Sequence, residues 1–417
     1  MRISKIVEWC TVGVVVLTAV VARADVVTDW NAKTGDITAA ARMPTPPTYR
    51  AMAITQVAVY EAVRAVTGRG APLFVKVNAA VGASVDAAVA AASRDVLLKL
   101  MPDQQMAVEE AYEDALAHLV ATEASRARGI EVGQRAASAI LALRRDDGAD
   151  TRDAYRPHTT PGAYVPTTLP VSPHWGKRRP WIMARANQVR PGPPPDLSGD
   201  IWARDYNEIK SVGAREGAQR TPEQTEAAHF WETAMPLIYF NVVRSFATTA
   251  GRDVTQNARL LAVVGMAMDD ALIAVLDAKY AYNFWRPITA IRNGDIDGNA
   301  ATERDPDWLP LIETPLHPEY PCAHCIVSAA VGTILDALHD ADTPLNLSGT
   351  SPTAPGAVHH WHSGSELAAE VAEARISSGV HYRNSTEVGA AMGRRIGELA
   401  IKAVGRERGV SAATPGS

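Results

Sequence analysis

Helical periodicity runs through most of this sequence and limits the folds open to it. Apolar residues return every three or four positions in long alanine-rich stretches, a spacing that places them on one face of a helix. The helices predicted from this spacing are 48–66, 82–101, 104–120, 124–146, 200–213, 222–250, 254–283, 324–339, 365–378 and 385–404. No stretch shows the strict apolar–polar alternation of a half-buried strand. The expected fold class is therefore all-α, a helical bundle with long ordered loops.

The composition agrees with a well-packed helical protein. Hydrophobic residues make up 47% of the 417 residues and aromatic residues only 6%, which suits many packed helices. At this length, one large domain and two domains are both open. The formal net charge of −5 gives no reason to expect a nucleic acid as partner.

Residues 1–24 have the pattern of a cleavable export signal. The basic start MRISK is followed by the mostly apolar run IVEWCTVGVVVLTAVV, and the ARA near its end fits a small-residue cleavage site. The run is short for a helix that spans a bilayer, so no stable membrane anchor is expected. Export would place the protein in the periplasm or outside the cell and leave 25–417 as one all-α domain. Only Cys322 and Cys325 would then remain, in a compartment that permits a disulfide.

Three irregular segments interrupt the helices. Residues 154–199 are rich in proline, but their tryptophans and tyrosines favour an ordered loop packed on the body of the protein. Residues 295–322 lead into the helix predicted at 324–339. Residues 341–364 include TSPTAPGAVHHWHSG and are expected to form a mobile surface loop. The histidines of HHWH have no predicted carboxylate partner there, so we do not assign them to a metal site.

Lys279 and Arg286 lie in the apolar and aromatic stretch KYAYNFWRP. They are seven positions apart, about two helical turns, so both can face the same way. The helix dipole alone also favours two cations close to a helix C-terminus. In apolar surroundings, however, these two cations need a partner, because burying an unpaired charge is costly.

The stretch YPCAHC comes directly before an apolar run. Pro321 ends the preceding local structure, so Cys322, Ala323 and His324 fall in the first turn of a new helix. Free N–H groups and the helix dipole attract anions there, and small residues let an anion approach the backbone. A histidine that only packs beside the core is the alternative.

A third cluster lies near the end of the chain. Arg375 falls in the last turn of a helix that Gly379 is expected to end. His381 follows in a short connection to the next helix. A surface arginine and a capping histidine are the alternative.

The three clusters together suit a tetrahedral oxyanion. Lys279, Arg286 and Arg375 supply positive charge, and arginine forks bind oxygen atoms in pairs. His324 and His381 supply a nucleophile or metal ligand and a general acid–base group. No carboxylate-rich pattern indicates a divalent metal.

The order Lys-x6-Arg-Pro, Pro-x-x-His and Arg-x5-His resembles the superfamily that joins vanadium-dependent haloperoxidases and type 2 phosphatidic acid phosphatases. The FWRP form of the first motif, with DDALIAVLDAKYAYNFWRPITAIR and TPLHPEYP around it, is similar to the haloperoxidase side. The motifs cover about 255–400, and a looser similarity reaches back to about 155. The resemblance implies an all-α fold around a four-helix-bundle core, often doubled.

The resemblance also implies a role for each motif residue. His381 would bind the vanadium atom of a vanadate cofactor, and His324 would be the acid–base group. The remaining motif residues would hold the oxygens of vanadate: Lys279, Arg286, Cys322, Ala323 and Arg375.

The implied activity is the oxidation of a halide by hydrogen peroxide to hypohalous acid, which then halogenates a small organic acceptor. His317 matches a histidine of the family's bromoperoxidases, where the fungal chloroperoxidase type has phenylalanine, so bromide or iodide is favoured. A loop histidine that only packs is the alternative. A homo-oligomer is left open.

The sequence departs from the family pattern at the second and third motifs. Cys322 and Ala323 replace the serine and glycine of Pro-Ser-Gly-His, and a thiol is a weaker hydrogen-bond donor than a hydroxyl. A disulfide to Cys325 would protect the thiol from oxidants but remove the donor. Ser385 stands where relatives commonly carry an aspartate that can orient the metal-binding histidine.

Other functions of the same residues stay open. In an acid phosphatase, His381 would attack phosphorus to form a phosphohistidine and His324 would protonate the leaving alcohol. An inactive relative that only binds an oxyanion is a third reading. A thiol oxidoreductase built on the C-x-x-C pair fits poorly, because nothing else indicates a thioredoxin-like fold.

Overall fold

The structure is a computed structural model that describes residues 25–78, 80–233, 236–248, 251–340 and 343–405. The predicted export signal, residues 1–24, lies outside the described residues. Over the described part of the chain, no helix combines the length and the apolar character needed to cross a membrane.

The expected all-α class is confirmed, since the described residues are mostly helical. The longer helices are α1 (Val26–Ala40), α2 (Thr45–Thr67), α3 (Val85–Leu100), α4 (Gln105–Ala117), α5 (Glu123–Leu143), α6 (Asp200–Val212), α7 (Pro222–Phe230), α8 (Pro236–Ala247), α9 (Val254–Tyr282), α11 (Ala323–Leu338), α12 (Gly364–Ser377) and α13 (Arg383–Val404). One further short helix, α10 (Pro287–Ile291), follows α9.

The helices differ clearly from the prediction in two places. In place of the one helix expected at 222–250, the described residues form α7 and α8, and α8 opens on Pro236, a residue that cannot continue a helix. Helix α1 was not predicted. Its buried face includes Thr28 and Asn31 besides Val27 and Trp30, so the sequence lacks the apolar stripe that marks a helix.

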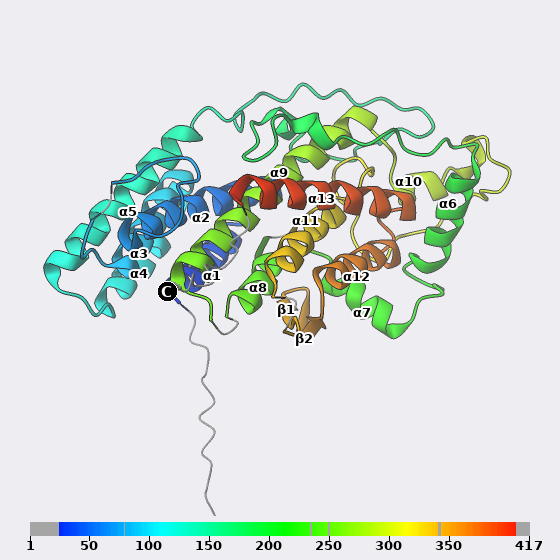
Figure 1. The fold of residues 1–417 in the computed structure, drawn as a ribbon. Coiled ribbons are helices and arrows are strands. Elements are labelled where there is room, and N and C mark those ends of the chain that lie inside the picture. The colour runs from blue at the N-terminus through cyan, green and yellow to red at the C-terminus, as the bar shows by residue number, and fades with distance from the viewer. Residues whose placement is uncertain (1–24, 79, 234–235, 249–250, 341–342, 406–417) are drawn as a thin grey trace, which may run out of the picture.

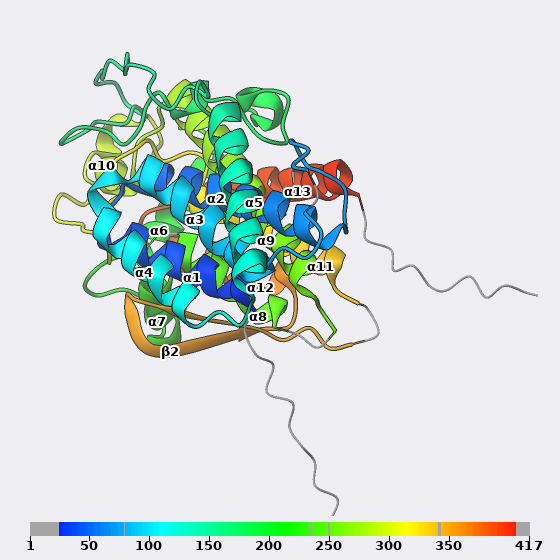
Figure 2. The ribbon, with the colours of Figure 1, turned by 90° about the vertical axis from the view of Figure 1, so that its left-hand side faces the viewer.

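Helix α9 lies at the centre and joins two groups of helices (Figure 1). Helices α2, α3, α4 and α5 form one group, in which α2 packs along α9. Helices α11 and α13 pack against α9 in the other group, and α12 lies beside α11. Figure 2 views the molecule from the end formed by α3, α4 and α5. One hydrophobic core runs through both groups, which explains why α9 is apolar on nearly every side.

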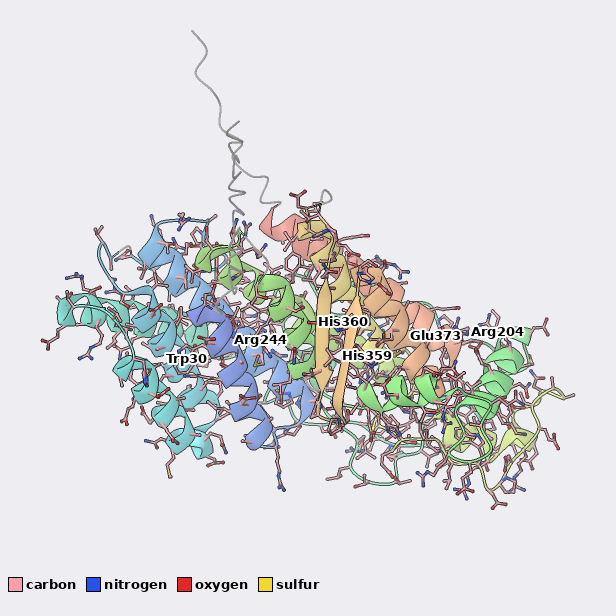
Figure 3. The ribbon with its side chains drawn as sticks, turned by 90° about the horizontal axis from the view of Figure 1, so that it is seen from below. Trp30, Arg204, Arg244, His359, His360 and Glu373 are labelled. Carbon is pink, nitrogen blue, oxygen red and sulfur yellow. A yellow bond between two sulfur atoms is a disulfide. The ribbon has the colours of Figure 1, made fainter. Side chains whose placement is uncertain are left out.

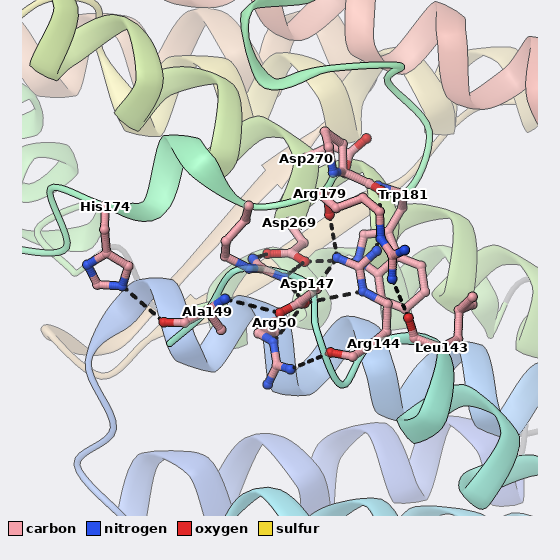
Figure 4. Close-up of polar contacts among 12 residues, drawn as sticks. Arg50, Leu143, Arg144, Asp147, Ala149, His174, Arg179, Trp181, Asp269 and Asp270 are labelled. Atoms are coloured by element: carbon pink, nitrogen blue, oxygen red, sulfur yellow. Dashed lines mark hydrogen bonds and ion pairs between the residues drawn. The ribbon is translucent and has the colours of Figure 1, made fainter. Parts of the chain in front are cut away.

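The proline-rich loop is ordered, as expected, and buried charges hold it on α9 (Figure 4). Arg178 donates to Asp269 at 2.6 and 3.1 Å and to Asp147 at 2.8 Å, and Figure 4 labels these two carboxylates. Asp270 accepts the backbone N–H groups of residues 181–183 at 2.6 to 2.9 Å. Two neighbouring carboxylates in the middle of α9 therefore anchor the loop.

Within the predicted mobile surface loop 341–364, the described residues from 343 on form regular structure instead. Strands β1 (Leu347–Ser351) and β2 (Ala354–Trp361) pair antiparallel, with Leu347 opposite Trp361, and β1 packs against α8. The hairpin escaped prediction because β1, LSGTS, is short and made mostly of small polar residues, so its alternation is weak.

A histidine of this hairpin has carboxylate partners, contrary to the prediction. Figure 3 shows His359 and His360 on β2. The ring nitrogens of His359 lie 2.7 Å from Glu370 and 3.0 Å from Glu226. Hydrogen bonding to Glu370 raises the pKa of His359, while burial acts in the opposite direction. Among the described residues, no group of three or more histidine, cysteine, aspartate or glutamate side chains is arranged to hold a metal ion.

Two glycines set the spacing between α11 and α12, the helices that carry His324 and Arg375. A Cβ at Gly332 would lie 2.2 Å from the carbonyl oxygen of Gly364. Because the obstacle is backbone, we expect Gly332→Ala to lower the free energy of unfolding by about 1–3 kcal/mol. Thermal unfolding measures the change. Gly192→Ala is the control, since no atom lies within 4 Å of its new Cβ, and equal losses in both variants would contradict the prediction.

Candidate active site

The first motif lies where α9 ends. Asn283 has a positive φ of 51° and donates its N–H to the Lys279 carbonyl, which ends the helix at Tyr282. Lys279 therefore lies in the last turn, whereas Arg286 lies beyond the helix and directly precedes α10. The prediction that one helical face carries both residues is wrong, because the chain turns between them.

Both cations are buried and are held by the loop before α11. Lys279 Nζ donates to the carbonyl oxygens of Pro318 and Glu319 at 2.8 and 2.7 Å. Arg286 Nε donates to the carbonyl oxygen of His317 at 2.8 Å. The exposed fractions of Lys279 and Arg286 are 0% and 1%. The loop thus brings the two cations of the first motif to the start of α11.

Helix α11 begins at Ala323, as the sequence predicted within one residue. Cys322 is the N-cap, and its Sγ accepts the N–H of Cys325 at 3.3 Å. In the first turn of a helix, backbone N–H groups such as those of Ala323 and His324 have no acceptor within the helix. They give α11 an anion-attracting end at the site.

Cys322 and Cys325 form a disulfide, and both are fully buried. The sequence left this pairing open. A disulfide sulfur has no proton, so Cys322 does not donate a hydrogen bond in the way expected for a thiol or for the serine of relatives. Donation at this end of the site falls to the backbone of α11.

Arg375 lies in the last turn of α12 and is fully buried. Its Nη1 donates to the carbonyl oxygen of Trp231. Its Nε and Nη2 have no hydrogen-bond partner among the described residues, and the same holds for Nε2 of His324, which is 5% exposed. These three nitrogens are free to contact a bound oxyanion.

His381 and His317 both lie beside Arg286. Arg286 Nη1 is 3.4 Å from His381 Nε2, and Arg286 Nη2 is 3.0 Å from His317 Nδ1. Arg286 also donates to the carbonyl oxygen of Val380 at 2.9 Å. The guanidinium therefore links the first motif to the segment after α12 and to the loop before α11.

Glu319 is the site residue that the sequence analysis missed. Its Oε1 lies 2.7 Å from His381 Nδ1 and accepts the N–H of Tyr382 at 3.1 Å. Its side chain is fully buried. The sequence did contain a signal for Glu319, the only glutamate in the stretch TPLHPEYP. Its neighbours are prolines and an aromatic residue, and a charge in an apolar setting needs a partner.

Burial and mutual repulsion shift the titratable groups of the site. Burial lowers the pKa of Arg286 to about 10 and that of Arg375 to about 9. Burial and the charge of Arg286 lower the pKa of Lys279. Burial, with Arg286 as the largest charge effect, lowers the pKa of His381, so its ring is neutral at pH 7. Burial also lowers the pKa of His324, with Arg375 acting in the same direction.

The residues present fit a small oxyanion. Lys279, Arg286 and Arg375 are cations that burial disfavours, and an anion among them would remove that cost. The free nitrogens of Arg375 and His324 supply donors for its oxygens. The carboxyl of Glu319 faces His381. Burial raises the pKa of this carboxyl to about 7, although the charges of Lys279 and Arg286 act to lower that pKa.

Comparisons with known proteins find vanadium haloperoxidases. The family model of the second helical-bundle domain of vanadium chloroperoxidase matches residues 259–408, which include all three motifs. Over these residues the chain is similar to vanadium-dependent haloperoxidases. It is 26% identical over 343 residues to vanadium chloroperoxidase of Curvularia inaequalis, a match that covers 60% of this chain. The chain spans about half the length of that relative, 55%.

Solved structures of vanadium-dependent haloperoxidases are similar to this chain in fold. The structure described as the first bacterial vanadium-dependent iodoperoxidase has a TM-score of 0.78 at 22% identity, covering 91% of this chain and 96% of that chain. A holo bacterial vanadium-dependent chloroperoxidase has a TM-score of 0.70 at 16% identity, covering 87% and 93%. The predicted vanadium haloperoxidase type of helical fold is therefore confirmed.

Proposed function

We propose that this protein is a vanadate-dependent haloperoxidase that uses hydrogen peroxide to oxidise bromide or iodide to hypohalous acid. One observation carries the proposal: three buried cations, Lys279, Arg286 and Arg375, all act to lower the pKa of His381, and Arg286 lies 3.4 Å from its Nε2. Such a site suits an anion whose central atom accepts a nitrogen ligand. Relatives named as a chloroperoxidase and an iodoperoxidase support a halide as substrate.

The residues of this chain would act by holding, orienting and moving protons. Lys279 Nζ, the guanidinium groups of Arg286 and Arg375, and the N–H groups at the start of α11 would hold the oxygens of vanadate. His381 would offer the lone pair of Nε2 to the vanadium. His324, whose Nε2 is free, would move a proton to or from bound peroxide. Vanadate, when bound, supplies a Lewis-acid centre that makes peroxide reactive towards halide.

His317 is the residue to which we assign the halide preference. It is half-buried beside Arg286, at 3.0 Å from that guanidinium. An imidazole here makes the halide side of the site more polar than a phenylalanine would. This difference supports bromide or iodide over chloride. The product would halogenate a small organic acceptor. We also propose export to the periplasm or the exterior, on the pattern of residues 1–24, and leave a homo-oligomer open.

A phosphatase is the second candidate, because the same cations would stabilise a phosphoryl group in transfer. The lowered pKa of His381, caused first by burial, keeps its ring neutral and nucleophilic. His324 would then protonate the leaving alcohol. Phosphate and vanadate would compete for one pocket.

A paired assay on one preparation tests the proposal. Bromination of a dione dye by hydrogen peroxide and bromide is measured with and without vanadate, and hydrolysis of a phosphomonoester is measured without vanadate. We expect vanadate-dependent bromination that His381→Ala reduces at least a hundredfold, because the ligand to vanadium is lost. His360→Ala, an exposed histidine on β2, is the matched control and should brominate like the wild type.

Two outcomes would contradict the haloperoxidase proposal. Phosphate release that vanadate inhibits, without bromination, would assign the site to a phosphatase. If neither bromination nor phosphate release is detected while vanadate still binds, the protein is an oxyanion-binding relative without catalytic activity.

A further inference from the structure

We propose that Glu319 is the positioning residue for His381, fixing its ring and its tautomer in place of the aspartate that relatives commonly carry at the position of Ser385. The inference rests on the proposed function in that His381 is taken as the ligand to vanadium. It assigns a role to Glu319 that the motif pattern does not contain.

The contacts of His381 define one tautomer. Nδ1 lies 2.7 Å from Glu319 Oε1, an oxygen that already accepts the N–H of Tyr382 and so faces His381 as an acceptor. Nε2 lies 3.4 Å from Arg286 Nη1, and a guanidinium only donates. Both neighbours therefore place the proton on Nδ1 and the lone pair on Nε2. A histidine that binds a metal commonly donates its other N–H to a carboxylate in this way.

Glu319 is itself held firmly enough to act as a support. Its N–H donates to the Phe284 carbonyl at 2.9 Å, and its own carbonyl accepts from Lys279 Nζ at 2.7 Å. Its Oε1 also accepts the N–H of Tyr382, so the carboxylate holds the backbone directly after His381. One residue thus ties the end of α9 to the segment that follows α12.

Position 385 faces the same carboxylate from α13. Ser385 is buried, and its hydroxyl acts to lower the pKa of Glu319, although neither Ser385 Oγ nor Glu319 Oε2 has a partner that meets hydrogen-bond geometry. The backbone of Ser385 accepts the N–H of Cys322 at 3.1 Å, which fixes the start of α13 against α11. An aspartate at position 385 would therefore direct its carboxylate into the space that Glu319 fills.

The first measurement concerns the wild-type protein without vanadate. Nitrogen-15 NMR of histidine-labelled protein at about pH 8 reports which ring nitrogen carries the proton, and the signals of His381 are identified by their loss in His381→Gln. We expect the Nδ1–H tautomer. A proton on Nε2, or on both nitrogens, would overturn the proposal. This measurement does not depend on vanadate binding or on haloperoxidase activity. It can therefore be interpreted even if the proposed function is wrong.

The second measurement uses a pair of variants and equilibrium dialysis against vanadate. We expect Glu319→Leu to mix the two tautomers and to weaken vanadate binding by about 10–100-fold, the usual effect of losing such a partner. Adding Ser385→Asp to Glu319→Leu should restore both the single tautomer and most of the affinity. Circular dichroism of each variant reports on folding.

A purely structural role for Glu319 would give a different result. It would lower the melting temperature without changing the tautomer, and Ser385→Asp would not restore vanadate binding. Wild-type vanadate affinity in folded Glu319→Leu would likewise overturn the proposal.

Discussion

Replacing Arg375 with methionine is expected to weaken oxyanion binding at least a hundredfold without lowering stability. The guanidinium offers Nε and Nη2 to the site, and each hydrogen bond to a charged group contributes about 1.5–3 kcal/mol. Two such bonds correspond to a factor of about 10² or more in affinity. Arg375 is fully buried, and its pKa falls to about 9 through burial, so the charge is costly without an anion. A methionine of similar length removes that cost.

Two measurements check this prediction. Calorimetric titration with vanadate and with phosphate gives the loss in affinity, and thermal unfolding without either anion gives the stability. Arg395→Met, at an exposed position of α13, is the control and should change neither. Wild-type affinity in Arg375→Met would show that this guanidinium does not contact the oxyanion. A large drop in melting temperature without anion would show that Arg375 is a structural cation.

Replacing Arg178 with methionine is expected to lower the free energy of unfolding by about 3–5 kcal/mol, the usual cost of breaking a buried ion pair from one side. Arg178 is fully buried between Asp147 and Asp269, whose side chains are also fully buried. In the variant, Asp147 still accepts from Arg50 Nε at 2.9 Å. Asp269 loses Arg178, the only guanidinium bonded to it among the described residues. An unpaired carboxylate would then remain inside the protein.

The effect of Arg178→Met should reach the active site through the proline-rich loop. Tyr164 N–H donates to the Asn283 carbonyl at 2.7 Å, and Trp285 N–H donates to the Gly162 carbonyl at 2.9 Å, so the loop pairs with the turn between Lys279 and Arg286. Chemical denaturation measures stability, and limited proteolysis measures loop release. Arg135→Met is the matched control, because its pair with Glu131 is exposed and contributes little. Equal stability of the two variants would contradict the prediction.

Much of the fold could be predicted because its signals are local. Periodicity placed α2, α3, α5, α9 and α13 close to their observed bounds. The end of α9 was also local in origin, since Asn283 tolerates a positive φ. The hairpin β1–β2 was missed, because short strands of small residues carry little pattern. Helix α1 was missed for a related reason: polar residues such as Asn31 line its buried face.

The candidate site could be predicted only in part. The motif residues came from spacing and resemblance, and the structure gathers Lys279, Arg286 and His381 around the loop before α11. The reason given for Lys279 and Arg286 was wrong, however, since a turn and not a shared helical face brings them together. The disulfide of Cys322 with Cys325 was left open, because three-residue spacing permits bonded and free cysteines alike.

The sequence by itself determined the helical class, the order of the three motifs and the helix end that attracts an anion. These depend on residues within one or two turns of each other. Only the tertiary structure decided which carboxylate supports His381 and which arginine holds the proline-rich loop. Glu319 and His381 are 62 positions apart, and Arg178 and Asp269 are 91 apart. Contacts over such distances depend on how the chain packs around α9, which local spacing does not encode.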